Sequence, residues 1–270
     1  MPPPHVNPFR HPGHIDARAG RRLNPGGVSP VFFKPARSAG VAMILEDFQK
    51  NFDNSKVLRL LGAKRGRRVS ASSQRRVDLV TENVEGMLRP QLSYRLLGMV
   101  EARRGKILLS DGTRFASPKI ARALSRAEKV CCFLATVGPA VDKRVQRLMA
   151  QGRCAEAYVL DAVGSMSVES VVEQFYQRMA RKQAGKGGGV TLRFSPGYCD
   201  WSIRQQHQLF AIFAGTDAPD VALSSRCLMT PRKSISGLFG LLPPGAKGAD
   251  PAYNPCSNCG KRDCIARRRN

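Results

Sequence analysis

The fold is decided by the stretch K-V-C-C-F-L-A-T-V-G, Lys129 to Gly138. Within it, the apolar run from Val130 to Val137 is bounded by a charged residue on one side and by a glycine on the other. Such a run predicts a β-strand that is buried on both faces. We therefore expect the thiols of Cys131 and Cys132, which lie inside the run, to belong to the core.

Helices are predicted on both sides of this strand. Pro139 begins a helix that turns Val141, Val145, Leu148 and Met149 inward and ends near Gly152. A longer helix follows over about 155–182 and ends at the glycine-rich G-K-G-G-G. Upstream, Val77, Val80, Val84 and Leu88 recur at helical spacing until Pro90.

The remaining segments predict strands and short helices. Two apolar runs flank Arg103, Arg104 and Gly105, which predicts a β-hairpin, and Ser117-Pro118 is typical of a helix start. Further elements are expected at 190–193 (strand), 201–213 (helix capped by Asp200), 221–223 and 235–241 (strands). Hairpins mixed with helices indicate an α+β fold with a mixed or antiparallel sheet.

The ends of the chain differ in composition from its middle. Residues 1–42 hold eight of the 18 prolines and a single acid, Asp16, and are expected to be a disordered, basic leader. Met43 opens a more ordinary segment, so a downstream start codon and an organelle-type leader both remain open. Without a secretory signal or a long apolar span, we expect a cytoplasmic protein.

The chain is strongly basic, with 44 Lys and Arg against 20 Asp and Glu and a formal net charge of +24. This charge favours anionic partners such as nucleic acid, acidic proteins or phosphorylated cofactors. The basic residues are spread along the sequence, so a broadly basic, soluble surface is the alternative interpretation.

Two carboxylates of the long predicted helix stand out. Glu169 and Glu173 are four residues apart and share one stripe with Tyr176 and apolar neighbours. Carboxylates on such a stripe repel each other, and burying either one is costly without a cation. The pattern leaves three alternatives open: a ligand-binding pair, a solvated edge of the helix, or a pair of internal ion pairs with a nearby Arg.

The segment R-F-S-P-G-Y, Arg193 to Tyr198, combines a guanidinium fork, a tight Pro-Gly turn and an aromatic hydroxyl. Its pattern, R-x-x-x-G-Y, resembles the S-adenosylmethionine-binding motif of the reactivation domain of cobalamin-dependent methionine synthase. The resemblance extends to V-G-S-M-S-V-E, 163–169, and to L-S-S-R-C-L-M-T-P-R-K-S-I-S-G, 223–237. Residues 55–150 look like the free-standing short forms of that domain.

The resemblance implies a methionine synthase activation-like domain over 43–240 that binds S-adenosylmethionine. Arg193 would hold the methionyl carboxylate and Glu169 would be a polar anchor, while the backbone around Ser195 and Gly197 would meet the adenosyl part. Tyr198 would line the methyl-donor pocket. Arg232 and Lys233 stand where the long enzymes carry small residues.

The same resemblance implies a role in cobalamin-dependent methyl transfer, either as a methyltransferase or as the component that reactivates one. This chain carries no recognisable corrinoid, folate or homocysteine module. Cobalamin would therefore be bound by a corrinoid-binding protein or by methionine synthase modules on another chain, with a reductase as a further possible partner.

The tail, 241–270, contains C-x2-C-x4-C, formed by Cys256, Cys259 and Cys264. This spacing predicts three thiolate ligands of one metal centre, with Cys227 as the candidate fourth. An iron-sulfur cluster and zinc both satisfy it, and the redox setting of the resembled family favours the cluster.

A second function remains open on charge alone, that of a nucleic-acid-binding protein with a Cys-ligated metal module. Its phosphate contacts would come from 64–68, Arg75, Arg76 and 267–269. Few aromatic residues accompany these cations, which argues against stacking on single-stranded bases.

Overall fold

The computed structural model describes residues 41–44, 57, 58, 61, 70–216, 218–246 and 248. Strand β1 (Val41–Ile44) begins two residues before the end of the predicted leader, because Val41 and Ala42 belong to it. The rest of the leader and the predicted metal-binding tail beyond residue 248 lie outside the described residues.

The sheet has β5 (Lys129–Thr136) as an inner strand. β5 pairs with β2 (Gln91–Arg103) on one side and with β9 (Ser234–Leu242) on the other. The strand order is β4-β3-β2-β5-β9-β6, β1 adds to β2, and every strand pair is antiparallel. The α+β class and the doubly buried strand predicted from residues 130–137 are confirmed.

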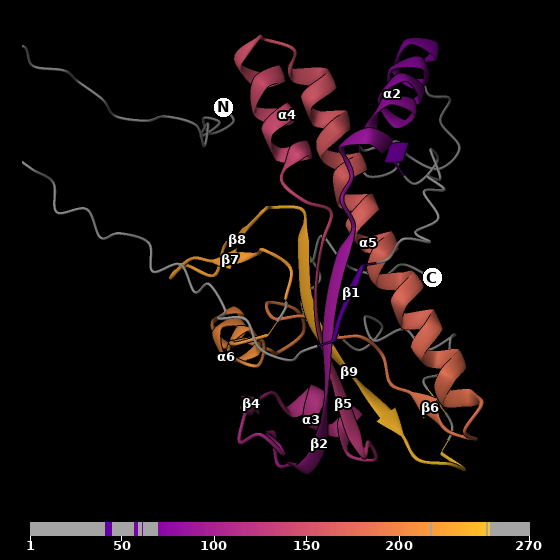
Figure 1. Ribbon diagram of the computed structural model, residues 1–270, viewed down its shortest axis with the longest axis vertical. Helices are drawn as coiled ribbons and strands as arrows, with labels where there is room; N and C mark the ends of the chain where they lie inside the picture. Colours follow the sequence, from indigo (N-terminus) through magenta and orange to yellow (C-terminus); the bar gives the residue numbers. More distant parts are fainter. Residues whose placement is uncertain are drawn as a thin grey trace, which may run out of the picture. The chain divides into compact units, whose positions relative to one another are not determined.

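Alternation along β5 divides the core into two layers. Cys131 and Phe133 face helices α2 (Ala71–Val84), α4 (Ala140–Ala150) and α5 (Cys154–Ala184). Cys132 and Leu134 face α3 (Pro118–Leu124) and α6 (Gln206–Ala211). Figure 1 shows the long α5 running beside the sheet, with α4 next to its first half.

The predicted hairpin forms between β2 and β3 (Lys106–Leu109). Its two turn residues, Arg104 and Gly105, both have positive φ angles, of 50° and 77°. Positive angles at both positions define a type I′ turn, whose twist matches that of the flanking strands. After β4 (Arg114–Ala116), the side chain of Ser117 caps α3 by accepting a hydrogen bond from the amide of Ile120, as predicted.

The predicted helix over 201–213 is wrong in its extent and its cap. The segment contains a single turn of 3₁₀-helix, Ile203–Gln205, and then α6, and Ser202 supplies the side-chain cap. Asp200 instead accepts hydrogen bonds from the Ser117 hydroxyl and, at 3.0 Å, from the Lys119 amide. A tertiary contact with α3 has therefore replaced the local cap.

The C-terminal part of the fold is irregular. Two-residue strands β7 (Ala222–Leu223) and β8 (Met229–Thr230) form a separate small sheet. β6 (Gly189–Val190) is shorter than the predicted strand over 190–193, and the chain regains the sheet at Phe194, which bridges to Leu238. None of the helices in the described ranges is both long and apolar enough to cross a lipid bilayer.

Candidate functional site

Helix α5 carries a polar stripe at the four-residue spacing of one helix face. The stripe contains Asp161, Ser165, Glu169 and Glu173. Apolar residues on the adjoining face, such as Val168, Val172 and Phe175, are buried against the sheet. The helix is therefore held by its apolar face, and its stripe is left for polar partners.

Arg193 reaches this stripe from the segment after β6. Its Nη2 lies 3.1 Å from Glu173 Oε2 and 3.6 Å from Glu169 Oε2. The Phe194–Leu238 bridge fixes the backbone next to Arg193, because each of these residues donates its amide to the carbonyl of the other at 2.9 Å. Two segments 20 residues apart in sequence thus place one guanidinium between two carboxylates.

Tyr176 supplies an aromatic wall for this cluster. The Arg193 guanidinium lies over its ring, 5.7 Å from the centroid, at a distance typical of a cation–π contact. The hydroxyl of Tyr176 donates a hydrogen bond of 2.8 Å to the Thr191 carbonyl, which ties the ring to the strand side of the site.

Exposure differs sharply between the two sides of the ion cluster. The Arg193 side chain is 20% exposed, whereas those of Glu169 and Glu173 are 59% and 48% exposed. Two carboxylates and one guanidinium leave a net charge of −1 that faces solvent. The cluster satisfies the internal ion-pair alternative, and it also joins the two residues that the resemblance assigned to one ligand.

The predicted Pro-Gly turn is confirmed. The amide of Tyr198 donates to the Ser195 carbonyl at 3.2 Å, and Gly197 has a φ of +91°. Proline followed by a glycine of positive φ is the pattern of a type II turn. The Gly197 amide donates to the carbonyl of Trp201 at 2.8 Å, so this N–H group is already used inside the loop.

The turn is pressed against β9 at a glycine. A Cβ atom placed on Gly237 would lie 2.6 Å from the Phe194 carbonyl oxygen and 3.0 Å from Ser195 Oγ. The S-I-S-G segment thus meets R-F-S-P-G-Y directly. Tyr198 is half-exposed at the tip of the turn, and its assignment to the methyl-donor pocket stays a prediction.

A second cation holds the other end of the stripe. Lys233 is buried, and its Nζ lies 2.7 Å from Asp161 Oδ1 and 3.0 Å from Ser165 Oγ. Its stem passes over Gly164, where a Cβ atom would approach the Lys233 side chain to 3.2 Å. The segment M-T-P-R-K-S is thereby fastened to the same helix that carries Glu169.

The predicted metal ligands are not brought together in the described residues. Cys256, Cys259 and Cys264 lie outside them, and Cys227 is half-buried in the turn between β7 and β8, with a φ of 61°. Within 70–216 and 218–246, no three His, Cys, Asp or Glu side chains are grouped so as to hold a metal ion.

Sequence reasoning missed the roles of Glu173 and Tyr176. The sequence places both on one side of the helix with Glu169 but gives neither a role of its own, yet Glu173 is closer to Arg193 than Glu169 is, and Tyr176 contacts the guanidinium. Glu173 follows Glu169 by four residues and Tyr176 follows Glu173 by three, and this helical spacing is the signal that could have found them. Which members of the stripe meet Arg193 depends on the rotation of α5 over the sheet.

Comparisons with known proteins find a structural similarity but no match by sequence. The sequence matches no family model, and no curated protein matches it. Among solved structures, the crystal structure of the MetH reactivation domain bound to AdoHcy is similar, with a TM-score of 0.48 and 16% identity. The match covers 70% of this chain and 70% of that chain.

Proposed function

We propose that this protein binds S-adenosylmethionine at the cluster of Arg193, Glu169 and Glu173. The observation that carries the proposal is the convergence of a largely buried guanidinium with two half-exposed carboxylates. Arg193 and Glu169 lie in the two segments whose motifs resemble the methionine synthase reactivation domain, and Glu173 is four residues further along the same helix. A mere surface ion pair would not require either motif.

The donor set fits the ligand in charge. S-adenosylmethionine carries one carboxylate and two cationic centres, the ammonium and the sulfonium, so its net charge of +1 complements the −1 of the cluster. Arg193 would exchange part of its carboxylate contact for the carboxylate of the ligand, and Glu169 or Glu173 would accept from the ammonium. The Tyr176 ring lies against one face of the Arg193 guanidinium and holds it in place.

The chain's own residues would orient the ligand and keep it fixed against its partner. Gly237 lets the Ser195–Tyr198 turn lie directly on β9, and Lys233 holds the neighbouring segment on α5. When bound, S-adenosylmethionine supplies an electrophilic methyl group on sulfur. Fixed orientation is the main contribution that a protein makes to such a transfer.

The methyl acceptor in this proposal is the corrinoid of a partner chain. After a reductase has reduced the oxidised, inactive cobalt, the cobalt would take the methyl group from the sulfonium, and S-adenosylhomocysteine would leave. The three tail cysteines, with Cys227, would hold an iron-sulfur cluster or zinc for this redox setting. A sample purified without oxygen and assayed for iron, acid-labile sulfide and zinc distinguishes the two centres. Zinc without iron would refute the cluster.

Calorimetric titration with S-adenosylmethionine tests the proposed site. Removal of a charged hydrogen-bonding partner costs about 2–3 kcal/mol, so Arg193→Ala should raise the Kd roughly 30- to 150-fold. Glu169→Gln and Glu173→Gln should each weaken binding less than Arg193→Ala does.

Arg204→Ala is the matched control, because Arg204 is an exposed arginine in the neighbouring 3₁₀ turn. Its Kd should equal that of the wild type. A wild-type titration without heat at several temperatures, or equal losses in Arg193→Ala and Arg204→Ala, would refute this site.

A further inference from the structure

The positive charge of the described residues is concentrated at one end of the sheet. Residues 99–129 and 181–190 contain eleven Lys and Arg against three acids, whereas the other described residues contain fourteen against ten. We call this region the basic end. Its cations are Arg103, Arg104, Lys106, Arg114, Lys119, Arg122, Arg126, Lys129, Arg181, Lys182 and Lys186, and all eleven are exposed.

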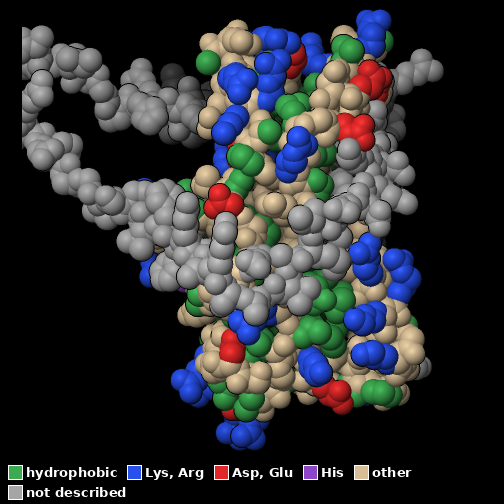
Figure 2. All heavy atoms as spheres, in the orientation of Figure 1, with side chains coloured by type: hydrophobic (Ala, Val, Ile, Leu, Met, Phe, Trp, Pro, Cys, Tyr) green, Lys and Arg blue, Asp and Glu red, His purple; other side chains and the backbone are tan. Residues whose placement is uncertain are grey.

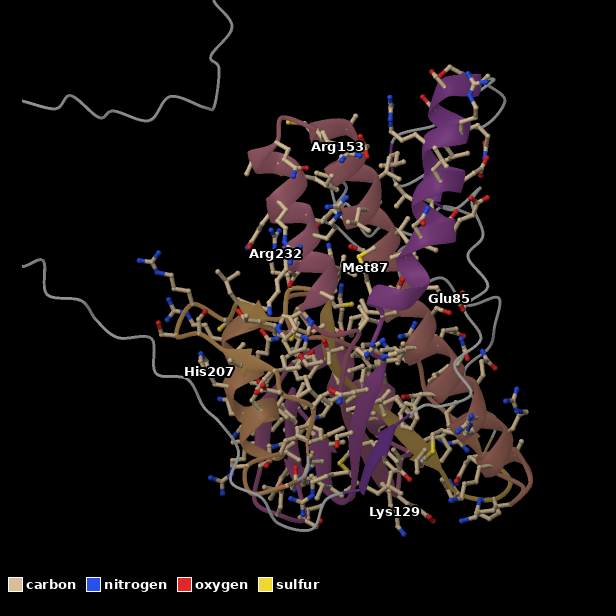
Figure 3. The ribbon with its side chains drawn as sticks, turned by 45° about the horizontal axis from the view of Figure 1, so that its top comes forward. Glu85, Met87, Lys129, Arg153, His207 and Arg232 are labelled. Atoms are coloured by element: carbon tan, nitrogen blue, oxygen red, sulfur yellow. The ribbon has the colours of Figure 1, made fainter. Side chains whose placement is uncertain are left out.

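Strand register explains why residues so far apart in sequence meet there. Lys129 begins β5 and pairs with Leu241 of β9, which pairs in turn with Val190 of β6, just after α5 ends. Figure 3 shows Lys129 at this end of the sheet and Arg153 at the opposite end, between α4 and α5. Figure 2 shows Lys and Arg side chains along the same end of the visible face, with few acidic ones between them.

A charged β-hairpin lies at the basic end. The pairing of β2 with β5 stops at Gly98, and β2 continues for five residues to Arg103, which corresponds to about 17 Å of strand. The type I′ turn then places Arg103, Arg104 and Lys106 at its tip, where Arg103 is 76% exposed and forms a surface ion pair with Glu101. Arg122 lies on α3, which packs against this hairpin.

The side chains of the basic end suit phosphates better than a protein surface or single-stranded bases. Its single aromatic residue, Phe115, is buried against Trp201, so no ring is presented for base stacking. Val100 is its one exposed large apolar side chain, whereas protein interfaces are anchored by several aromatic or aliphatic residues. Exposed arginines and lysines are the groups that contact a nucleic-acid backbone.

We propose that the basic end is a binding surface for the phosphate backbone of a nucleic-acid duplex, with Arg103, Arg104 and Lys106 among its phosphate contacts. This surface is distinct from the S-adenosylmethionine site and uses none of its residues.

The test is fluorescence anisotropy of the full chain with a 20-base-pair DNA duplex of arbitrary sequence, over a range of KCl concentrations. The tip variant combines Arg103→Gln, Arg104→Asn and Lys106→Gln, since Asn tolerates the positive φ at 104. Loss of three phosphate contacts should reduce the slope of log K against log salt by about 2.7. Affinity at 100 mM KCl should fall at least tenfold.

The charge-matched control combines Arg75→Gln, Arg76→Gln and Arg144→Gln, on α2 and α4 outside the basic end. It should keep the wild-type slope, and the tip variant should keep the wild-type Kd for S-adenosylmethionine. If the tip variant fails to fold by circular dichroism, Arg122→Gln, Arg126→Gln and Lys129→Gln replace it with the same expectation.

Two results would overturn the proposal. The first is a tip variant that binds the duplex like the wild type or like the control. The second is poly-L-glutamate of equal charge that competes as well as unlabelled duplex, which would mark the basic end as a docking face for an acidic protein. An RNA duplex of equal length, measured in parallel, distinguishes the two sources of such a backbone.

Discussion

Gly237 shows how one residue without a side chain keeps two motifs in contact. A methyl group at this position would lie 2.6 Å from the Phe194 carbonyl oxygen and 2.7 Å from Phe133 Cζ. Because backbone and a buried ring have little room to move, Gly237→Ala should destabilise the fold by about 1–3 kcal/mol. Urea unfolding followed by circular dichroism measures the change.

Gly86→Ala is the control for this substitution, because nothing lies within 4 Å of a Cβ atom placed there. Its free energy of unfolding should stay within about 0.5 kcal/mol of the wild type. Equal stability of Gly237→Ala and the wild type would show that the R-F-S-P-G-Y turn does not press on β9.

The pair of Lys233 and Asp161 is asymmetric, since the Lys233 side chain is 6% exposed and that of Asp161 is 38% exposed. Asp161→Asn leaves a buried ammonium without its carboxylate and should cost about 2–4 kcal/mol. Lys233→Met removes the buried charge and leaves a hydrated carboxylate, so it should cost less than about 1 kcal/mol. Urea unfolding of both variants checks the order, and a larger loss for Lys233→Met would contradict it.

At the scale of elements, β5 makes a prediction about pH. Burial raises the pKa of the Cys131 thiol, with the neighbouring Cys132 adding to the effect, and burial also raises the pKa of Cys132, helped by Asp111 and opposed by Arg95. Above pH of about 8.5, the unfolded chain loses these thiol protons while the folded chain keeps them. The contribution of the two thiols to the free energy of unfolding is therefore fully present below that pH and is lost as the pH rises.

The free energy of unfolding should fall by up to about 1.4 kcal/mol per pH unit for each thiol. Urea unfolding between pH 8 and 10 should show a flatter pH dependence for the Cys131→Ala, Cys132→Ala double variant than for the wild type. Cys154→Ala, at an exposed position, should keep the wild-type slope. Parallel slopes in all three proteins would contradict the double burial of β5.

Elements whose signals are local could be predicted from the sequence. The apolar run at 130–137, the Arg104-Gly105 turn and the Ser117 cap each depend on adjacent residues, and the structure confirms them. Asp200 was misassigned because its partners, Ser117 and the Lys119 amide, come from α3, more than 80 residues away. No local pattern distinguishes such a contact from a helix cap.

At the scale of the whole molecule, two features emerge only when the chain is folded. Arg193 meets Glu173, 20 residues earlier in the sequence, because β6 returns the chain along α5. Helical spacing alone could not tell whether Glu173 pairs with a cation or lies on a solvated edge of the helix. Likewise, cations that look evenly spread in the sequence gather at one end because β2, β5, β9 and α5 begin or end there.

The central claim is that S-adenosylmethionine binds between α5 and the Arg193–Tyr198 segment, and hydrogen–deuterium exchange with and without the ligand tests it most directly. The account predicts slower amide exchange in peptides covering 166–177 and 191–198, and no such protection in Arg193→Ala. Protection confined to other peptides, or equal protection in Arg193→Ala, would contradict it.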